Sequence, residues 1–340
     1  MVVRSARLGL AIATRRPLPF STTFILTHRC NFRCAYCDIP DAAGDEMSTA
    51  EFCRAIDELA AIGLARASFS GGEALLRRDA VAIIRHAHAR GLTTSLNSNA
   101  WLTESRLDDL DGALDMLVIS LDGTEDTHDL VRGRRGSFAR VMKVLDAARA
   151  RGIATATITV LSHQNLDVVD RVLALAARHG FFAYFQPAYT DCFEHRAGLD
   201  PALGSRVLAD ISDQLRRAKA AGLPVGASEG FLQRLERGPA FGDCSTCTAG
   251  RYFATVMPDG TMVPCHLVSH DKPYPNGRTM GFGAAFQALP RDKRGPGCAI
   301  SPYQESDLIF GLDARAIAAA ARRLAGILPS PRGGRPPRGP

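Results

Sequence analysis

The sequence predicts an α/β protein in which six strand–helix units precede a small cysteine-rich segment. Between residues 21 and 220, apolar or β-branched runs alternate with stretches of helical spacing. Strands that alternate with helices run parallel and are joined by right-handed crossovers. Cysteine, glycine and acidic motifs follow several of these strands, so the candidate site is expected at their carboxyl ends, where barrel enzymes hold theirs.

The predicted strands are short runs bounded by polar or turn-forming residues. They cover residues 22–26, 66–70, 93–97, 116–120, 153–160 and 181–186. The helices between and after them are expected at 49–62, 79–90, 105–110, 137–151, 168–179 and 204–220. In the first helix Phe52, Ile56 and Leu59 share a face, and Ser48 or Thr49 is a plausible N-cap with Glu51 in the first turn.

Three cysteines lie within eight residues directly after the first predicted strand: Cys30, Cys34 and Cys37, spaced C-x3-C-x2-C. Thiolates are soft ligands, and three so close together suit zinc or an iron–sulfur cluster. Three thiolates would leave one iron of a four-iron cluster open to an outside ligand. The alternatives are a three-thiol zinc knuckle and cysteines that pack as small hydrophobes.

Two further motifs follow strands. Gly71, Gly72 and Glu73 come after the second, and two glycines there let the backbone approach a ligand closely. Ser120-Leu-Asp122-Gly follows the fourth strand. Asp122 either faces a ligand or forms the turn before the glycine.

Together these motifs, with Tyr36 just before the third cysteine, resemble the radical S-adenosylmethionine (radical SAM) enzymes over roughly residues 21–311. The resemblance implies a partial (β/α)6 TIM-type barrel. It implies that Cys30, Cys34 and Cys37 hold a [4Fe–4S] cluster whose open iron chelates SAM. The residues implied to seat SAM are Tyr36, Gly71, Gly72, Glu73, Ser120 and Asp122.

In that family one electron cleaves SAM to a 5′-deoxyadenosyl radical, which removes hydrogen from the substrate. The implied partners are therefore an electron donor such as flavodoxin or ferredoxin and a peptide or small-molecule substrate. This chain departs from the family pattern at Ala74, where proline is usual, and at Asn97-Ser98-Asn99, where Thr-Asn-Gly is frequent.

A second cysteine group comprises Cys244, Cys247, Cys265 and Cys298. A hairpin around Pro258-Asp259-Gly260 is expected to bring Cys247 and Cys265 to one end. The pattern C-x12-G-x4-C resembles the first half of the SPASM module and the shorter twitch module, which hold auxiliary [4Fe–4S] clusters. A second cluster is therefore expected, although four cysteines that include a CxxC pair also match a zinc ribbon.

The predicted domains are an N-terminal extension (1–20), a radical SAM barrel (21–228), a SPASM/twitch-like auxiliary-cluster domain (229–311), and a helix with a Pro/Gly/Arg tail (312–340). Net charge is +6, but residues 1–16 and the last twelve residues carry seven arginines and no acid. The body is thus near neutral and is not expected to bind nucleic acid. The basic tails either contact RNA or membrane or are solvated and disordered.

No run of 18 apolar residues occurs, so no membrane span is predicted. The N-terminal apolar patch is shorter than a usual signal-peptide core, and a cytoplasmic protein is expected.

The sequence therefore favours a radical SAM enzyme that acts on a peptide or small molecule. The alternative is a non-catalytic iron–sulfur or zinc-binding scaffold, against which the intact SAM-seating motifs argue. Cys192, just beyond the sixth strand, either donates a hydrogen atom to a substrate radical or is an idle loop cysteine.

Overall fold

A computed structural model of the chain describes residues 2–37, 39, 44–188, 203–237, 247–265, 273–291, 298 and 300–327, with the backbone alone at 2–6 and 323–327. Within these residues one eight-stranded sheet has the order β6-β5-β4-β3-β2-β1-β7-β8. The strands are β1 (Ser21–Ile25), β2 (Arg66–Ser70), β3 (Thr93–Ser98), β4 (Met116–Ser120), β5 (Ala154–Leu161), β6 (Phe182–Pro187), β7 (Phe253–Val256) and β8 (Met262–Val263).

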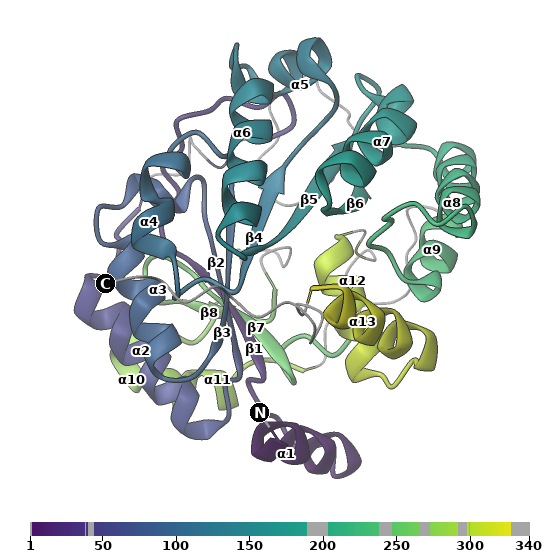
Figure 1. Ribbon diagram of the computed structural model, residues 1–340. Coiled ribbons are helices and arrows are strands. Elements are labelled where there is room, and N and C mark those ends of the chain that lie inside the picture. Colours follow the sequence, from purple (N-terminus) through teal and green to yellow (C-terminus); the bar gives the residue numbers. More distant parts are fainter. Residues whose placement is uncertain are drawn as a thin grey trace, which may run out of the picture.

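The helices lie mainly on the outside of this curved sheet (Figure 1). They are α1 (Val2–Ala13), α2 (Thr49–Ile62), α3 (Ala80–Ala89), α4 (Leu107–Leu110), α5 (Glu125–Arg132), α6 (Ser137–Ala150), α7 (Val169–His179), α8 (Ser205–Ala220), α9 (Glu229–Glu236), α10 (Gly277–Met280), α11 (Phe282–Gln287), α12 (Ser301–Phe310) and α13 (Ala314–Ile327). The six predicted strands are confirmed, all parallel and in sequence order.

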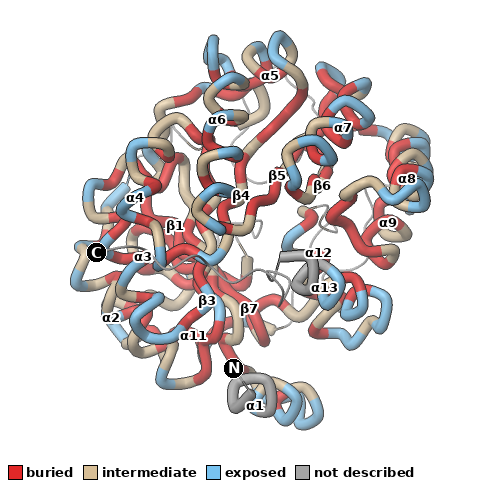
Figure 2. Tube along the Cα trace, viewed as in Figure 1, coloured by how far each residue is buried: buried red, intermediate tan, exposed pale blue. Residues whose placement is uncertain are grey.

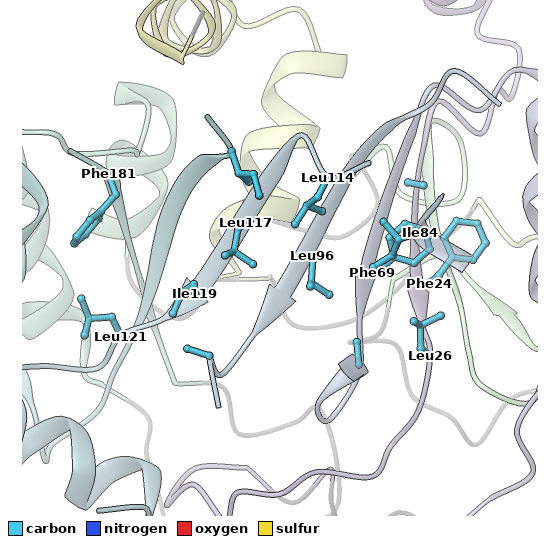
Figure 3. Close-up of a cluster of buried hydrophobic side chains, with 14 of the residues drawn as sticks. Phe24, Leu26, Phe69, Ile84, Leu96, Leu114, Leu117, Ile119, Leu121 and Phe181 are labelled. Atoms are coloured by element: carbon cyan, nitrogen blue, oxygen red, sulfur yellow. The ribbon is translucent and has the colours of Figure 1, made fainter. Parts of the chain in front are cut away.

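The core fills the space between the strands and the surrounding helices. Alternate strand residues such as Phe24, Phe69 and Leu96 are fully buried there, and Figure 3 shows them along adjacent strands. The strands are buried along most of their length, whereas the helices expose their outer faces (Figure 2). The opposite strand face is less covered, because Ser68 and Ser95, which pair in register, are half-buried. The concave side therefore presents hydroxyl groups.

The cysteine-rich segment shares the barrel's sheet. The hairpin predicted around Pro258-Asp259-Gly260 is present, because β7 and β8 pair antiparallel. However, β7 also pairs parallel with β1, from Ser21 opposite Phe253 to Phe24 opposite Val256. The predicted division at residue 228 thus separates segments that are joined by backbone hydrogen bonds.

Helix α12 lies between the two ends of the parallel array, near β6 and β7 (Figure 1). The Ser301 backbone N–H donates to Gln186 Oε1 on β6 over 3.2 Å. The Tyr303 ring stacks on Phe253 of β7 with centroids 5.5 Å apart. The barrel is incomplete, and α12 bridges its gap.

The structure differs from the expectation of a disordered N-terminal extension, because residues 2–13 form α1. Its Ala11 is buried in a cluster with Leu18, Tyr252 and Phe310. The Tyr252 hydroxyl donates to the Ala11 carbonyl over 3.3 Å. The sequence concealed this helix because its apolar partners lie more than 200 residues away.

A second difference is α5, which occupies the stretch expected to be a basic loop. Its buried face carries His128, Val131 and Arg132, so two of its three inward positions are polar and the apolar periodicity is lost. The helix ends at Gly133, which has a left-handed conformation with φ +61°. In the described part of the chain, no helix combines the length and apolar character needed to cross a membrane.

Candidate functional site

The first three motif cysteines lie on the loop that leaves the carboxyl end of β1. All three carry free thiols, and Cys34 is buried. Burial raises the pKa of Cys37 to about 11, and the charges of Cys34 and Cys30 raise it further. Burial and Cys34 likewise raise the pKa of Cys30. Three thiolates in this arrangement repel one another, so a bound cation would stabilise them.

Arg77 holds the two ends of the cysteine loop together. Its buried Nη1 donates to the Leu26 carbonyl over 3.3 Å and to the Met47 carbonyl over 2.9 Å. Asp79 binds the other edge of the guanidinium over 2.6 Å. The loop between β1 and α2 is therefore closed at its base by a residue that sequence analysis did not single out.

Gly71 and Gly72 allow the β2 loop to pack directly on the cysteine loop. A Cβ on Gly71 would lie 2.3 Å from the Thr27 carbonyl oxygen, and one on Gly72 would lie 2.4 Å from that of Arg29. The Gly72 N–H donates to Thr27 O over 2.8 Å. The close approach inferred from the two glycines is thus seen here between two backbones of the same chain.

Glu73 is fully buried, and its carboxylate joins the ends of β2 and β3. It accepts hydrogen bonds from the Ser98 hydroxyl at 3.0 Å, the Asn99 N–H at 2.8 Å and the Leu75 N–H at 3.2 Å. Burial raises the pKa of Glu73, whereas these hydrogen bonds oppose the rise. The Asn99 side chain continues the network to Asn31 over 2.8 Å, beside Cys30.

Asp122, at the end of β4, is also completely buried. Its Oδ2 accepts from the Tyr36 hydroxyl over 2.8 Å and lies 2.7 Å from Arg132 Nε. Its Oδ1 accepts from the Val160 N–H over 2.9 Å. Burial raises the pKa of Tyr36 well above its usual range. The structure therefore places two residues expected to seat SAM, Tyr36 and Asp122, in direct contact.

His128 supports this network from α5. Its Nδ1 accepts from the Asp122 N–H over 3.0 Å, and its Nε2 lies 3.0 Å from the Ser137 hydroxyl. Burial first, and then the charge of Arg132, lower the pKa of His128 to about 3. The imidazole is therefore neutral, with its proton on Nε2. Ser120 lies half-buried one layer below, opposite Ile158.

The described members of the second cysteine group also gather. Burial raises the pKa of Cys298 far above its usual range, and the charges of Cys265 and Cys247 add to the effect. Tyr303 of α12 lies beside them, and its hydroxyl is 3.3 Å from Thr255 Oγ1. Cys244 and Cys192 lie outside the described residues.

The donor set fits the cofactors that the motifs imply. Soft, free thiols gather in threes, and each group is partly shielded from water. Among the described residues, no three Cys, His, Asp or Glu side chains converge on a single metal-ion position. Sequence reasoning missed Ser98, Asn99 and Arg132; the only signal for Arg132 was its place in a basic stretch.

Comparison with known proteins gives the following matches. The family described as "Radical SAM superfamily" matches residues 24–176. PqqA peptide cyclase of Ruegeria pomeroyi is 34% identical over 274 residues, covering 74% of this chain and 68% of that protein. PqqA peptide cyclase of Rhodopseudomonas palustris is 33% identical, covering 75% of this chain and 69% of that one.

Two groups of solved structures share the fold. Streptococcus suis SuiB bound to its precursor peptide SuiA superposes with a TM-score of 0.67 at 13% identity, covering 83% of this chain and 68% of SuiB. Against SuiB alone this chain spans 64% of the relative's length. The enzyme anSMEcpe with bound AdoMet gives a TM-score of 0.64 at 18% identity, with 81% of each chain covered.

Proposed function

The chain belongs to the radical SAM superfamily, and from this premise we propose that Cys30, Cys34 and Cys37 hold the [4Fe–4S] cluster to which SAM binds. The observation that carries the proposal is the gathering of these three free thiols at the carboxyl end of β1, directly beside the loops that follow β2 and β4. When bound, the cluster supplies the electron that cleaves SAM to a 5′-deoxyadenosyl radical.

The protein's own contribution is to bind and orient SAM and to exclude water. Gly71 and Gly72 bring the β2 loop against the cysteine loop. Glu73 fixes the start of the loop after β3 through Ser98 and Asn99. Asp122 and Tyr36 brace each other at the end of β4. We assign these residues, with Ser120, to the SAM pocket.

We propose a peptide as the substrate. Support comes from the relatives named PqqA peptide cyclase, at 29–34% identity over about three quarters of this chain. The concave strand face offers hydroxyl groups from Thr23, Ser68 and Ser95, which suit the amide groups of an extended peptide. Cys192 remains a predicted hydrogen-atom donor to the substrate radical.

We further propose an acidic electron-transfer protein, such as flavodoxin or ferredoxin, as the reductant. Arg33 of the cysteine loop and Arg134 and Arg135 of the following turn are exposed, and Leu130 beside them is 71% exposed. The Ala35 N–H donates to the Val131 carbonyl over 2.8 Å, so this surface adjoins the cysteine loop. A basic surface with an apolar centre would attract an acidic partner.

The second cysteine group is proposed to hold an auxiliary [4Fe–4S] cluster, with a structural zinc ion as the alternative. Three of its members, Cys247, Cys265 and Cys298, interact electrostatically in the structure.

The test of the main proposal is anaerobic incubation of reconstituted, reduced protein with SAM, followed by measurement of 5′-deoxyadenosine. Wild type should form it, Cys30→Ala should not, and Cys53→Ala should match wild type because Cys53 lies in α2, outside both groups. Absence of 5′-deoxyadenosine from wild-type protein that holds iron would favour a non-catalytic scaffold.

The electron donor is tested separately. Arg134→Glu together with Arg135→Glu should slow turnover with a flavodoxin at low salt and leave turnover with dithionite unchanged. Equal slowing with both reductants would contradict a docking role.

A further inference from the structure

Arg132 is a buried cation that contacts one of the proposed cluster ligands. Its side chain is 8% exposed, and its Nη1 donates to Cys34 Sγ over 3.5 Å. It is the last residue of α5, and 98 positions separate it from Cys34. Nothing in the SAM-seating motifs of the sequence requires a cation at this position.

The guanidinium is fixed from three sides. Its Nε lies 2.7 Å from Asp122 Oδ2, an ion pair without the alignment of a hydrogen bond. Its Cζ lies 5.6 Å from the centre of the Tyr36 ring. The next residue, Gly133, packs so closely on the cysteine loop that a Cβ there would lie 2.7 Å from Arg33 O. Arg132 therefore has little freedom to turn away from Cys34.

The neighbouring charges are nearly all negative or become negative when metal binds. Asp122 faces Arg132 directly, and Cys34 becomes a thiolate as a ligand. Arg132 also acts electrostatically on Cys30, Cys37 and Glu73, lowering the pKa of Cys30 and of Glu73 against the effect of burial. One buried cation thus lies among several anions, and no other described cation is placed within hydrogen-bond distance of the three thiols.

The reduction potential of an iron–sulfur cluster depends on its net charge, on hydrogen bonds to its sulfur atoms and on exposure to solvent. A cation held beside a ligand sulfur favours the more negative, reduced state, and it acts strongly where water is scarce. A hydrogen bond to the thiolate acts in the same direction.

We propose that Arg132 is a positioning residue that holds a fixed positive charge and a hydrogen bond against the Cys34 thiolate and thereby raises the reduction potential of the cluster. Through Asp122 the same guanidinium couples that ligand to the loop after β4. This inference rests on the proposed function, because it requires that Cys34 bind the cluster. It adds a determinant of how readily the cluster accepts the electron.

The test is a mediated redox titration of the anaerobically reconstituted, full-length protein, followed by the electron spin resonance signal that changes when SAM is added. The variants are Arg132→Gln, Arg132→Lys and the control Arg151→Gln. Arg151 forms an Arg–Asp pair with Asp108 over 2.7 Å, at the opposite ends of the strands from the cysteines. Iron content and SAM binding are measured for each variant.

Arg132→Gln should lower the ratio of reduced to oxidised cluster about tenfold at a fixed potential, equivalent to ~59 mV for a one-electron couple. Arg132→Lys should recover most of the difference because it keeps the charge. Arg151→Gln should match wild type. A ratio in Arg132→Gln that differs from wild type by less than about twofold would overturn the proposal, since removal of a contacting charge must act on the potential.

Arg132→Gln leaves Asp122 as a buried charge without its cation, which threatens folding. The same comparison is therefore made between Asp122→Asn and Asp122→Asn/Arg132→Gln, where no unpaired carboxylate remains. The about tenfold decrease is expected again in this background, and its absence again overturns the proposal. A wild-type protein without any SAM-responsive cluster would instead refute the proposed function, so the two failures are distinguishable.

Discussion

Glu73 illustrates how a residue recognised by motif acquires its role from burial. From the sequence it was expected to bind SAM directly. In the structure its carboxylate is fully buried and accepts three hydrogen bonds from Ser98, Asn99 and Leu75. The side chain therefore shapes the two loops that flank the pocket, and an effect on SAM binding would pass through them.

Glu73→Ala should lower the free energy of unfolding by about 2–3 kcal/mol, because buried N–H and O–H groups lose their acceptor. SAM affinity should fall while the iron content stays at the wild-type level. Urea unfolding, equilibrium dialysis with SAM and iron analysis check these outcomes. Ser98→Ala, which removes one of the donors, is the matched control and should cost about 1 kcal/mol. Wild-type SAM affinity in Glu73→Ala would contradict the assignment.

His128 gives the fold a dependence on pH. Its pKa is lowered to about 3 in the folded protein, whereas an exposed histidine has a pKa of about 6.5. Between these values the unfolded chain binds a proton that the folded chain excludes. Stability is therefore complete above about pH 6.5 and falls as pH decreases, by up to about 1.4 kcal/mol per unit.

Urea unfolding at pH 7.5 and 5.5 tests this effect. Wild type should lose about 1 kcal/mol more than His128→Gln over this interval, since glutamine can still accept from the Asp122 N–H and donate to Ser137 without titrating. An identical decrease in both proteins would show that other groups are responsible.

At the scale of elements, the turn between α5 and α6 supports the cysteine loop. Gly133 and Gly136 both have left-handed backbones, with φ of +61° and +79°. Only Gly133 is in close contact, 2.7 Å from Arg33 O to an added Cβ, whereas Gly136 faces open space. The pair separates the cost of backbone strain from the effect of displacing the cysteine loop.

Both Gly133→Ala and Gly136→Ala should lose about 1 kcal/mol of stability from backbone strain. Gly133→Ala should additionally lose iron from the SAM-responsive cluster, because the added methyl group displaces the backbone between Cys30 and Cys34. Thermal unfolding and iron analysis after reconstitution measure the two effects. Equal iron content in the two variants would mean that the cysteine loop adapts to the displacement.

At the scale of the molecule, α12 connects the second cysteine group to both ends of the barrel. Gln304 Nε2 donates to the Cys298 carbonyl over 2.7 Å, and Tyr303 stacks on Phe253 of β7. The Ser301 N–H reaches Gln186 on β6. A metal site in this group would therefore also stabilise the closure of the barrel.

After anaerobic reconstitution, wild type should hold about eight irons in two four-iron clusters. Replacing Cys30, Cys34 and Cys37 by alanine should leave about four and abolish the SAM-dependent spectral change. Replacing the four cysteines of the second group should keep SAM binding but lower stability. About four irons with one tightly bound zinc in the wild type would make the second group a zinc site.

The sequence by itself determined the parallel strand order, the strand boundaries and the cysteine, Gly-Gly-Glu and Ser-Leu-Asp-Gly motifs, because periodicity and spacing are local properties of the chain. Only the tertiary structure decided that β7 joins β1, that Glu73 binds Ser98 and Asn99, and that Arg132 reaches Cys34. These contacts join residues brought together by the sheet and its loops, and a buried polar group reveals its partner only when both are placed in space.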